Sequence, residues 1–191
     1  MKAFIILSLV HFVSFAQLAA SPETIRIPLK KIFPEVDTPK PVMLLPVPDS
    51  SGRALFVLQG GKVLLLPEKS KPSAPSVFID MSSENMIANS FEEGLLGLTF
   101  HPKYPEDKRF YIYHTLQGPK RSLLIEGRID DPRKLTVDKS HRRVLLEIRQ
   151  PYWNHNSGIP SLVLMDIFIW QLEMEGRQTT HMILAKTRFP C

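Results

Sequence analysis

The sequence predicts an all-β fold, and three observations lead to that expectation. Short apolar segments recur between residues 41 and 158, bounded by clusters of Gly, Pro, Asn, Asp or Ser. Most of these segments are apolar nearly throughout, which is typical of sheets covered on both faces. The same range carries no convincing amphipathic helical period. Together these features indicate the stacked sheets of a β-sandwich or a propeller.

Each expected strand ends at a recognisable turn. Asp49-Ser50-Ser51-Gly52 follows the first strand, and Gly60-Gly61 is interpreted as a two-residue hairpin turn between the second and third. Asp130 to Ser140 is expected to be a polar connection before the last strand. The expected strands are Val42–Pro46, Ala54–Gln59, Lys62–Leu66, Val77–Asp80, Leu95–Phe100, Arg109–Thr115, Ser122–Arg128 and Arg143–Ile148.

Several aromatic and histidine side chains are expected to be structural. Phe110, Tyr111 and Tyr113 are assigned to core and cross-strand packing. His101 precedes Pro102 at the end of a strand, so its imidazole is expected to be satisfied by the turn. His114, His141 and His181 have no partner at metal-ligand spacing.

The N-terminal segment has the layout of a secretory signal peptide. Lys2 is followed by an apolar run from Ala3 to Phe15 and by the small residues Ala19 and Ala20, so cleavage is expected after Ala20. A signal anchor is the alternative, but the run is shorter than the ~20 residues of a bilayer span. Residues 21–40 are rich in proline and charge and are expected to form an extended lead-in.

Composition excludes several classes of protein. The formal charge of +5 falls to 5 − 1 = +4 without Lys2, and no Lys/Arg run of the nucleic-acid-binding type is present. The only cysteine is Cys191, so no internal disulfide can form. The sequence contains no nucleophile elbow, phosphate-binding loop or zinc pattern.

Three stretches carry a resemblance to a known family. They are Phe-Glu-Glu-Gly-Leu-Leu-Gly-Leu-Thr-Phe-His-Pro-Lys-Tyr at 91–104, Arg-Phe-Tyr-Ile-Tyr-His-Thr at 109–115, and Asn-His-Asn-Ser-Gly at 154–158. They resemble the glucose/sorbosone dehydrogenase family, which includes soluble aldose sugar dehydrogenases dependent on pyrroloquinoline quinone (PQQ) and hedgehog-interacting-protein-like proteins. The resemblance covers roughly Pro41 to Gly158. It implies a partial six-bladed β-propeller, roughly the first two to three blades, since one blade needs ~40–45 residues.

The resemblance also implies a site. His155 matches the general base that removes the proton from the anomeric hydroxyl of the sugar, a task suited to imidazole. Asn154 stands where glucose dehydrogenases have Asp, and an amide can orient the ring but not stabilise its cation. Glu92 falls where the family has a polar residue lining the cofactor pocket; a solvated loop charge is an equally weighted alternative.

For cofactors and partners, the resemblance implies PQQ and calcium in the full-length family. The cofactor-clamping residues and the calcium loop come from later blades, so this chain is expected to bind neither and to be inactive. A sugar substrate is implied for the completed protein, which is expected to be secreted, with no nucleic-acid partner and no membrane attachment after cleavage. The alternatives are a non-enzymatic, hedgehog-interacting type of propeller with an extracellular protein ligand and a carbohydrate-binding propeller without redox activity. The absence of cysteine before Gly158 counts mildly against the hedgehog-interacting type.

The resemblance stops at Gly158, and Ile159–Cys191 is interpreted as an out-of-frame tail. New codons can be built from the third base of each residue and the first two bases of the next. They permit Gly-Pro-Asp-Gly-Tyr-Leu-Tyr from Leu162 to Ile169 and Gly-Asp-Gly-Gly from Leu172 to Gly176. This is what the family carries next. A genuine alternative C-terminus from splicing is the competing explanation. In the sequence as given, Gln171–Lys186 could be helical.

Overall fold

The structure is a computed structural model, and it describes residues 26–30, 36, 39–68, 73–84, 86, 92–150, 160–163, 167–173 and 180–186. From residue 161 on, the backbone alone is described. The chain divides into two compact units, Met1–Pro34 and Glu35–Cys191, and all the strands belong to the second. No described segment forms a helix that is long and apolar enough to span a membrane.

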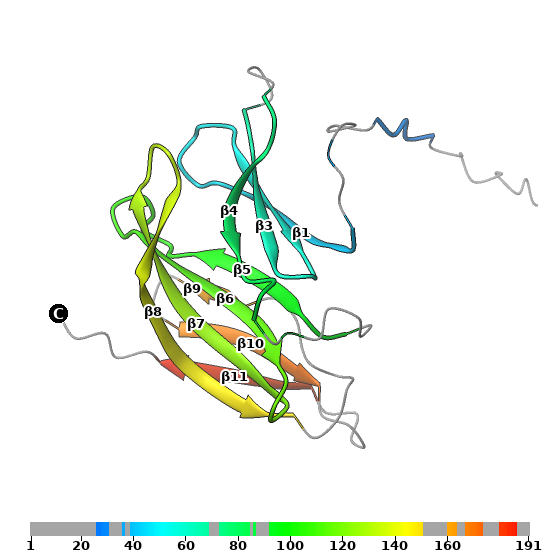
Figure 1. Ribbon diagram of the computed structural model, residues 1–191, viewed down its shortest axis with the longest axis vertical. Coiled ribbons are helices and arrows are strands. Elements are labelled where there is room, and N and C mark those ends of the chain that lie inside the picture. Colours follow the sequence, from blue (N-terminus) through cyan, green and yellow to red (C-terminus); the bar gives the residue numbers. More distant parts are fainter. Residues whose placement is uncertain are drawn as a thin grey trace, which may run out of the picture. The chain divides into compact units, whose positions relative to one another are not determined.

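The first sheet has four antiparallel strands that follow one another in chain order (Figure 1). A hydrogen bond from Gly61 N to Leu58 O, 3.0 Å long, closes the turn between the second and third strands. This places Gln59 and Gly60 at the centre of the turn, one residue earlier than the sequence indicated. The strands are β1 (Pro41–Pro46), β2 (Ala54–Leu58), β3 (Lys62–Leu66) and β4 (Ser76–Asp80).

The second sheet repeats this arrangement with longer strands. Its order is also the chain order, and every neighbouring pair is antiparallel. The expectation of a polar connection from Asp130 to Ser140 was wrong, because the last two strands pair as far as Asp131↔Thr136. Polar residues fit here because this end of the hairpin is largely solvent-exposed. The strands are β5 (Leu95–Phe100), β6 (Arg109–Leu116), β7 (Arg121–Asp131) and β8 (Thr136–Arg149).

The main core contains side chains from both of these sheets. Leu55 and Val57 of the first sheet belong to one buried cluster with Leu98 and Ile112 of the second. Phe78 and Phe110 meet edge to face, with ring centroids 5.2 Å apart. A smaller cluster around Tyr111 and Tyr113 is separate from this core. Because side chains alternate along β6, Phe110 and Ile112 serve the main core, whereas the two tyrosines serve the smaller cluster. The structural assignment of these aromatic residues is confirmed.

A third, three-stranded antiparallel sheet follows, in the order β11-β10-β9. Its strands are β9 (Ser161–Val163), β10 (Ile167–Glu173) and β11 (Thr180–Lys186). A helix over Gln171–Lys186 was therefore the wrong expectation for the residues described. Ile-Phe-Ile-Trp at 167–170 explains the outcome, since β-branched and aromatic residues favour strands. The all-β prediction is confirmed for the described part of the chain.

Candidate functional site

The start of β5 is tied to the end of β2 by hydrogen bonds between the two sheets. Leu95 N donates to Gln59 O over 2.9 Å, and Gln59 Nε2 donates to Glu93 O over 2.8 Å. Gly94, between them, has a φ of +121°, and a Cβ there would overlap the Gln59 carbonyl. Glycine is therefore required for the two sheets to approach this closely.

The two glutamates before Gly94 have different environments. Glu93 is 1% exposed, and its Oε1 lies 2.8 Å from Nζ of Lys120. The geometry of this contact is not that of a hydrogen bond, so Glu93 and Lys120 are described as an ion pair. Glu92, the residue selected from the sequence, is only half-buried. The sequence Glu-Glu-Gly does not distinguish the two carboxylates, and the position of Gly94 against Gln59 decides which one turns inward.

The predicted base lies outside the described residues, together with Asn154. The last described residue before them, Gln150, is nevertheless fixed beside Lys120. Its backbone N donates to Lys120 O over 3.2 Å, and its Nε2 donates to Ser122 Oγ over 3.0 Å. Gln150, the last described residue before Asn154 and His155 in the sequence, therefore lies at the end of the sheet where Glu93 and Lys120 lie.

The acidic residues described at this end do not favour PQQ, although Arg121 and Arg149 lie opposite each other at the same end of the sheet. The quinone carries three carboxylates, so it needs cationic groups to hold it. Glu92 and Glu93 supply negative charge, and the nearby ammonium of Lys120 is already paired with Glu93. Among the described residues, no group of three or more His, Cys, Asp or Glu side chains could hold a metal ion.

A second group of charges surrounds Glu126 on β7, a residue that the sequence analysis did not select. This carboxylate is 2% exposed. Its Oε1 lies 3.1 Å from His141 Nε2, and its Oε2 lies 2.9 Å from Arg143 Nη2 and 3.8 Å from Arg109 Nη1. The strand register places Glu126 opposite Arg143. Burial of this carboxylate is therefore compensated by several basic partners. The registers of β7 with β6 and with β8 bring these residues together, and sequence patterns specify strand register poorly.

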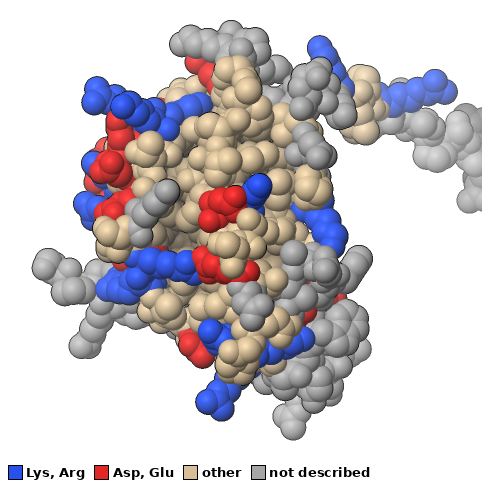
Figure 2. All heavy atoms as spheres, in the orientation of Figure 1, with Lys and Arg blue, Asp and Glu red and all other residues tan. Residues whose placement is uncertain are grey.

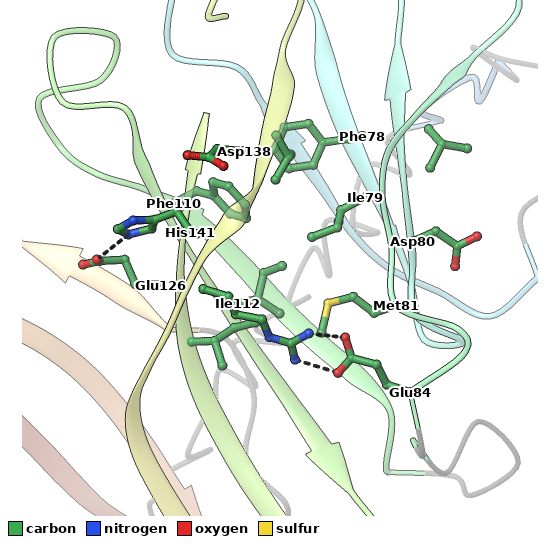
Figure 3. Close-up of a pocket in the computed structure, with 15 residues that line it drawn as sticks. Phe78, Ile79, Asp80, Met81, Glu84, Phe110, Ile112, Glu126, Asp138 and His141 are labelled. Atoms are coloured by element: carbon green, nitrogen blue, oxygen red, sulfur yellow. Dashed lines mark hydrogen bonds and ion pairs between the residues drawn. The ribbon is translucent and has the colours of Figure 1, made fainter. Parts of the chain in front are cut away.

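A pocket of about 490 Å³ opens between β4 and the second sheet (Figure 3). Glu84 bridges the sheets here through a bidentate ion pair with Arg142. Its Oε2 also lies 3.8 Å from Nε2 of His114. His114 is fully buried, and this burial lowers its pKa to about 4. The pocket is lined by Val77, Phe78, Ile79, Asp80, Met81, Glu84, Phe110, Ile112, Ile125, Glu126, Gly127, Val137, Asp138, His141 and Arg142.

Another predicted role is confirmed at His101. The backbone N of Lys103 donates to His101 Nδ1 over 3.2 Å, so the turn satisfies the imidazole as expected. Acidic and basic side chains are interspersed on the face shown in Figure 2, and no large patch of one sign forms there.

Comparison with curated proteins finds sequence relatives, although no family model matches the chain. The HIPL1 protein of Arabidopsis thaliana is 36% identical over 110 residues, covering 50% of this chain and 15% of that protein. The hedgehog-interacting proteins of Mus musculus and Homo sapiens are each 30% identical over 129 residues, covering 62% of this chain and 18% of theirs. The chain therefore spans less than a fifth of these relatives.

Solved structures with a similar fold include sugar dehydrogenases. The PQQ-bound aldose sugar dehydrogenase of Streptomyces coelicolor has a TM-score of 0.58 at 17% identity, covering 74% of this chain and 40% of that one. The apo form of the soluble aldose sugar dehydrogenase of Escherichia coli gives 0.56 at 20%, covering 73% and 39%. An oxidoreductase of the glucose dehydrogenase type from Thermus thermophilus gives 0.54 at 24%, covering 71% and 37%.

These structures establish the fold, and the curated relatives agree with it. The predicted fold class, a partial β-propeller, is confirmed. The predicted resemblance is confirmed as well: this chain is a propeller segment similar to PQQ-dependent sugar dehydrogenases in structure and to hedgehog-interacting-protein-like proteins in sequence.

Proposed function

We propose that the chain is the first part of a secreted propeller whose complete form is an aldose dehydrogenase. One observation supports the proposal: Gln150, five residues before His155 in the sequence, lies beside Lys120, which is paired with Glu93, the neighbour of Glu92. In this proposal His155 accepts a proton from a sugar hydroxyl, and Asn154 orients its ring. Glu92 contributes a polar wall to the same pocket.

We propose further that the chain does not act by itself. At this end Glu92 and Glu93 oppose a tricarboxylate, Lys120 is paired with Glu93, and Arg121 Nε lies 3.7 Å from Glu147 Oε1. PQQ added to the purified chain with calcium should give no saturable absorbance change. A frame-corrected, full-length chain should reduce a dye when aldose, PQQ and calcium are present, and its His155→Gln variant should lose this activity. Saturable PQQ binding by the present chain would contradict the second proposal, and an inactive full-length chain would contradict the first.

A non-enzymatic binding propeller is the second candidate, and the sequence relatives favour it. The proteins matching at 30–36% identity are of the hedgehog-interacting type, whereas the dehydrogenases match at 17–24%. The same full-length chain separates the two. A lack of turnover combined with saturable binding of an extracellular protein ligand would support this candidate.

The tail after Gly158 has a separate test in the coding DNA. We propose that residues 159–191 arise from a shift of the reading frame, because the overlapping codons permit the string that the family resemblance implies. Sequencing the gene should reveal Gly-Pro-Asp-Gly-Tyr-Leu-Tyr one base out of phase. A splice junction at residue 159 without that string would exclude the frameshift.

A further inference from the structure

The chain contains five pairs of adjacent basic residues. A serine endopeptidase of trypsin-like specificity binds the Lys or Arg before the cleaved bond in a pocket that carries an aspartate. Each pair is therefore a cleavage site in the unfolded chain, and the structure decides which of them is a site in the folded protein. The pairs are Lys30-Lys31, Lys108-Arg109, Lys120-Arg121, Arg133-Lys134 and Arg142-Arg143.

A protease holds its substrate in an extended conformation and forms hydrogen bonds with the substrate backbone, as an added strand does. Several consecutive residues must therefore be free of other strand pairing. A strand of a sheet meets this condition only after local opening, which costs much of the stability of the fold. The rate of cleavage then follows the small population of the open form.

Four of the five pairs belong to the second sheet. Arg109 and Arg121 are the first residues of β6 and β7, and Arg142 and Arg143 lie inside β8, where they are paired with β7. The side chains of Arg142 and Arg143 are 43% and 46% exposed. Exposure of the side chains alone does not make this pair a cleavage site, because its backbone is held in the sheet.

The pair Arg133-Lys134 lies in the turn between β7 and β8, and the side chain of Arg133 is 96% exposed. However, Arg133 N donates to Asp131 Oδ1 over 2.9 Å, and Arg133 O accepts from Arg53 Nη1 over 2.7 Å. The two strands are paired as far as Asp131↔Thr136. The turn is therefore too short and too firmly held to become an extended substrate.

The pair Lys30-Lys31 has a different setting. Residues 26–30 form no strand or helix, and all five are exposed. Ile27 and Leu29 are 76% and 95% exposed, so the side chains before the pair are open to the groove of a protease. The segment lies near the end of the first compact unit, Met1–Pro34, and outside all the strands. Lys31 lies outside the described residues and enters by its sequence alone.

We propose that Lys30-Lys31 is a processing site for an extracellular serine endopeptidase of trypsin-like specificity. Water is the second substrate: the peptide C–N bond after one of the two lysines breaks, that lysine gains a carboxylate, and the next residue gains a free amino group. The location of this step rests on the secretion proposed above, whereas the susceptibility of the bond depends neither on secretion nor on PQQ or aldose chemistry. In cells without such a protease the chain keeps this segment.

Trypsin tests the site by comparing the folded chain with peptides. Five peptides, each carrying one pair with its natural neighbours, give the rate of cleavage for an unstructured substrate. Mass spectrometry follows the initial rates at the same bonds in the purified chain. Cleavage at Lys30-Lys31 should stay within about threefold of the peptide rate, whereas each of the other four pairs should be slowed at least about a hundredfold. Equal slowing at all five pairs, or a smaller slowing at a pair of the second sheet than at Lys30-Lys31, would overturn the proposal.

Two matched double variants test the residues. Lys30→Gln with Lys31→Gln should abolish the cut at this pair. Arg133→Gln with Lys134→Gln removes an exposed pair held in a turn and should leave the cut at Lys30-Lys31 unchanged. Thermal unfolding before and after the cut should give the same midpoint, because no strand is removed. Loss of the N-terminal segment at an unchanged rate from the Lys30→Gln, Lys31→Gln chain, or a cut that lowers the midpoint, would contradict the assignment.

Discussion

At the scale of single residues, His114 is the most unusual side chain of the described structure. It is fully buried on β6, and neither ring nitrogen has a hydrogen-bond partner. Burial, aided by the nearby charges of Arg142 and Arg121, lowers its pKa from 6.5 to about 4, although the carboxylate of Glu84 acts in the opposite direction. The neutral imidazole is therefore the form that the fold accepts.

This environment predicts a pH-dependent stability. Between pH 6.5 and about 4 the unfolded chain binds a proton at His114 that the folded chain does not, so stability falls as the pH falls. The loss should reach about 3 kcal/mol when both states are protonated. Urea unfolding at several pH values measures it. The His114→Leu variant should lose this part of the pH dependence, and an unchanged pH dependence in that variant would contradict the assignment.

A second prediction at this scale concerns Gly127, which lies opposite Phe110 in the strand register. A Cβ at this position would meet the ring of Phe110, which is itself held between the sheets. Gly127→Ala should therefore destabilise the fold by about 1–3 kcal/mol through overpacking. Gly60→Ala is the matched control, because a Cβ there meets nothing within 4 Å. Similar denaturation midpoints for the two variants would show that the ring of Phe110 moves away freely.

At the scale of elements, Arg53 joins connections that are far apart in sequence. It lies in the connection between β1 and β2, where its Nε donates to Ser51 Oγ over 2.9 Å and its Nη2 pairs with Asp49 Oδ2 at 2.6 Å. Its Nη1 also donates to Arg133 O over 2.7 Å, and its Nη2 to Pro132 O over 3.2 Å, in the turn between β7 and β8. One guanidinium thus links the two sheets at this end.

The guanidinium of Arg53 donates hydrogen bonds from three nitrogens, so another cation cannot readily replace it. Arg53→Lys keeps the charge but offers one nitrogen in place of three, so the variant should lose about 1–2 kcal/mol of unfolding free energy. Arg128→Lys, at an exposed position on β7, should change it by less than about 0.5 kcal/mol. Chemical denaturation of both variants gives the comparison. An unchanged free energy of unfolding in Arg53→Lys would mean that the link between the turns contributes nothing to stability.

At the scale of the whole molecule, the first sheet presents two apolar faces. One face packs against the second sheet through Leu55, Val57 and Val63. On the other face the strand register aligns Leu44, Phe56, Leu64 and Val77 across all four strands, and Leu44 and Val77 are exposed. In a propeller a sheet is covered on both faces. This chain spans only about two fifths of the solved propellers that it resembles, which agrees with one apolar face of the sheet being partly exposed. It also explains why the strands of this sheet are apolar nearly throughout.

Secretion gives a prediction for the whole chain. If residues 1–20 are a signal peptide, the protein recovered from the medium of expressing cells should begin at Ser21. The physical basis is the short apolar run after Lys2 and the small residues that end at Ala20. N-terminal sequencing and intact mass measure the outcome. Recovery of the chain with Met1 still attached and held in the membrane fraction would favour the signal anchor instead.

Strand positions were largely predictable from the sequence, whereas the details of the candidate site were not. Apolar runs and turn residues indicated β3 and β5 with their observed bounds and the other first-sheet strands to within one residue. Both β7 and β8 were expected, but their paired far ends, residues 129–131 and 136–142, were missed because polar residues at an exposed end give no periodic pattern. The buried member of the pair Glu92 and Glu93 was also missed, since the contact of Gly94 with Gln59 joins different sheets.

The sequence by itself determined the all-β class, the approximate strands and the resemblance to sugar-dehydrogenase propellers, because these depend on local periodicity, turn residues and short motifs. Tertiary structure alone decided which charges meet: Glu93 with Lys120, Glu126 with Arg143 and His141, and Glu84 with Arg142. These partners lie on different strands or on the connections between strands. Their pairing follows from strand register and from the packing of one sheet on the other, which no local pattern encodes.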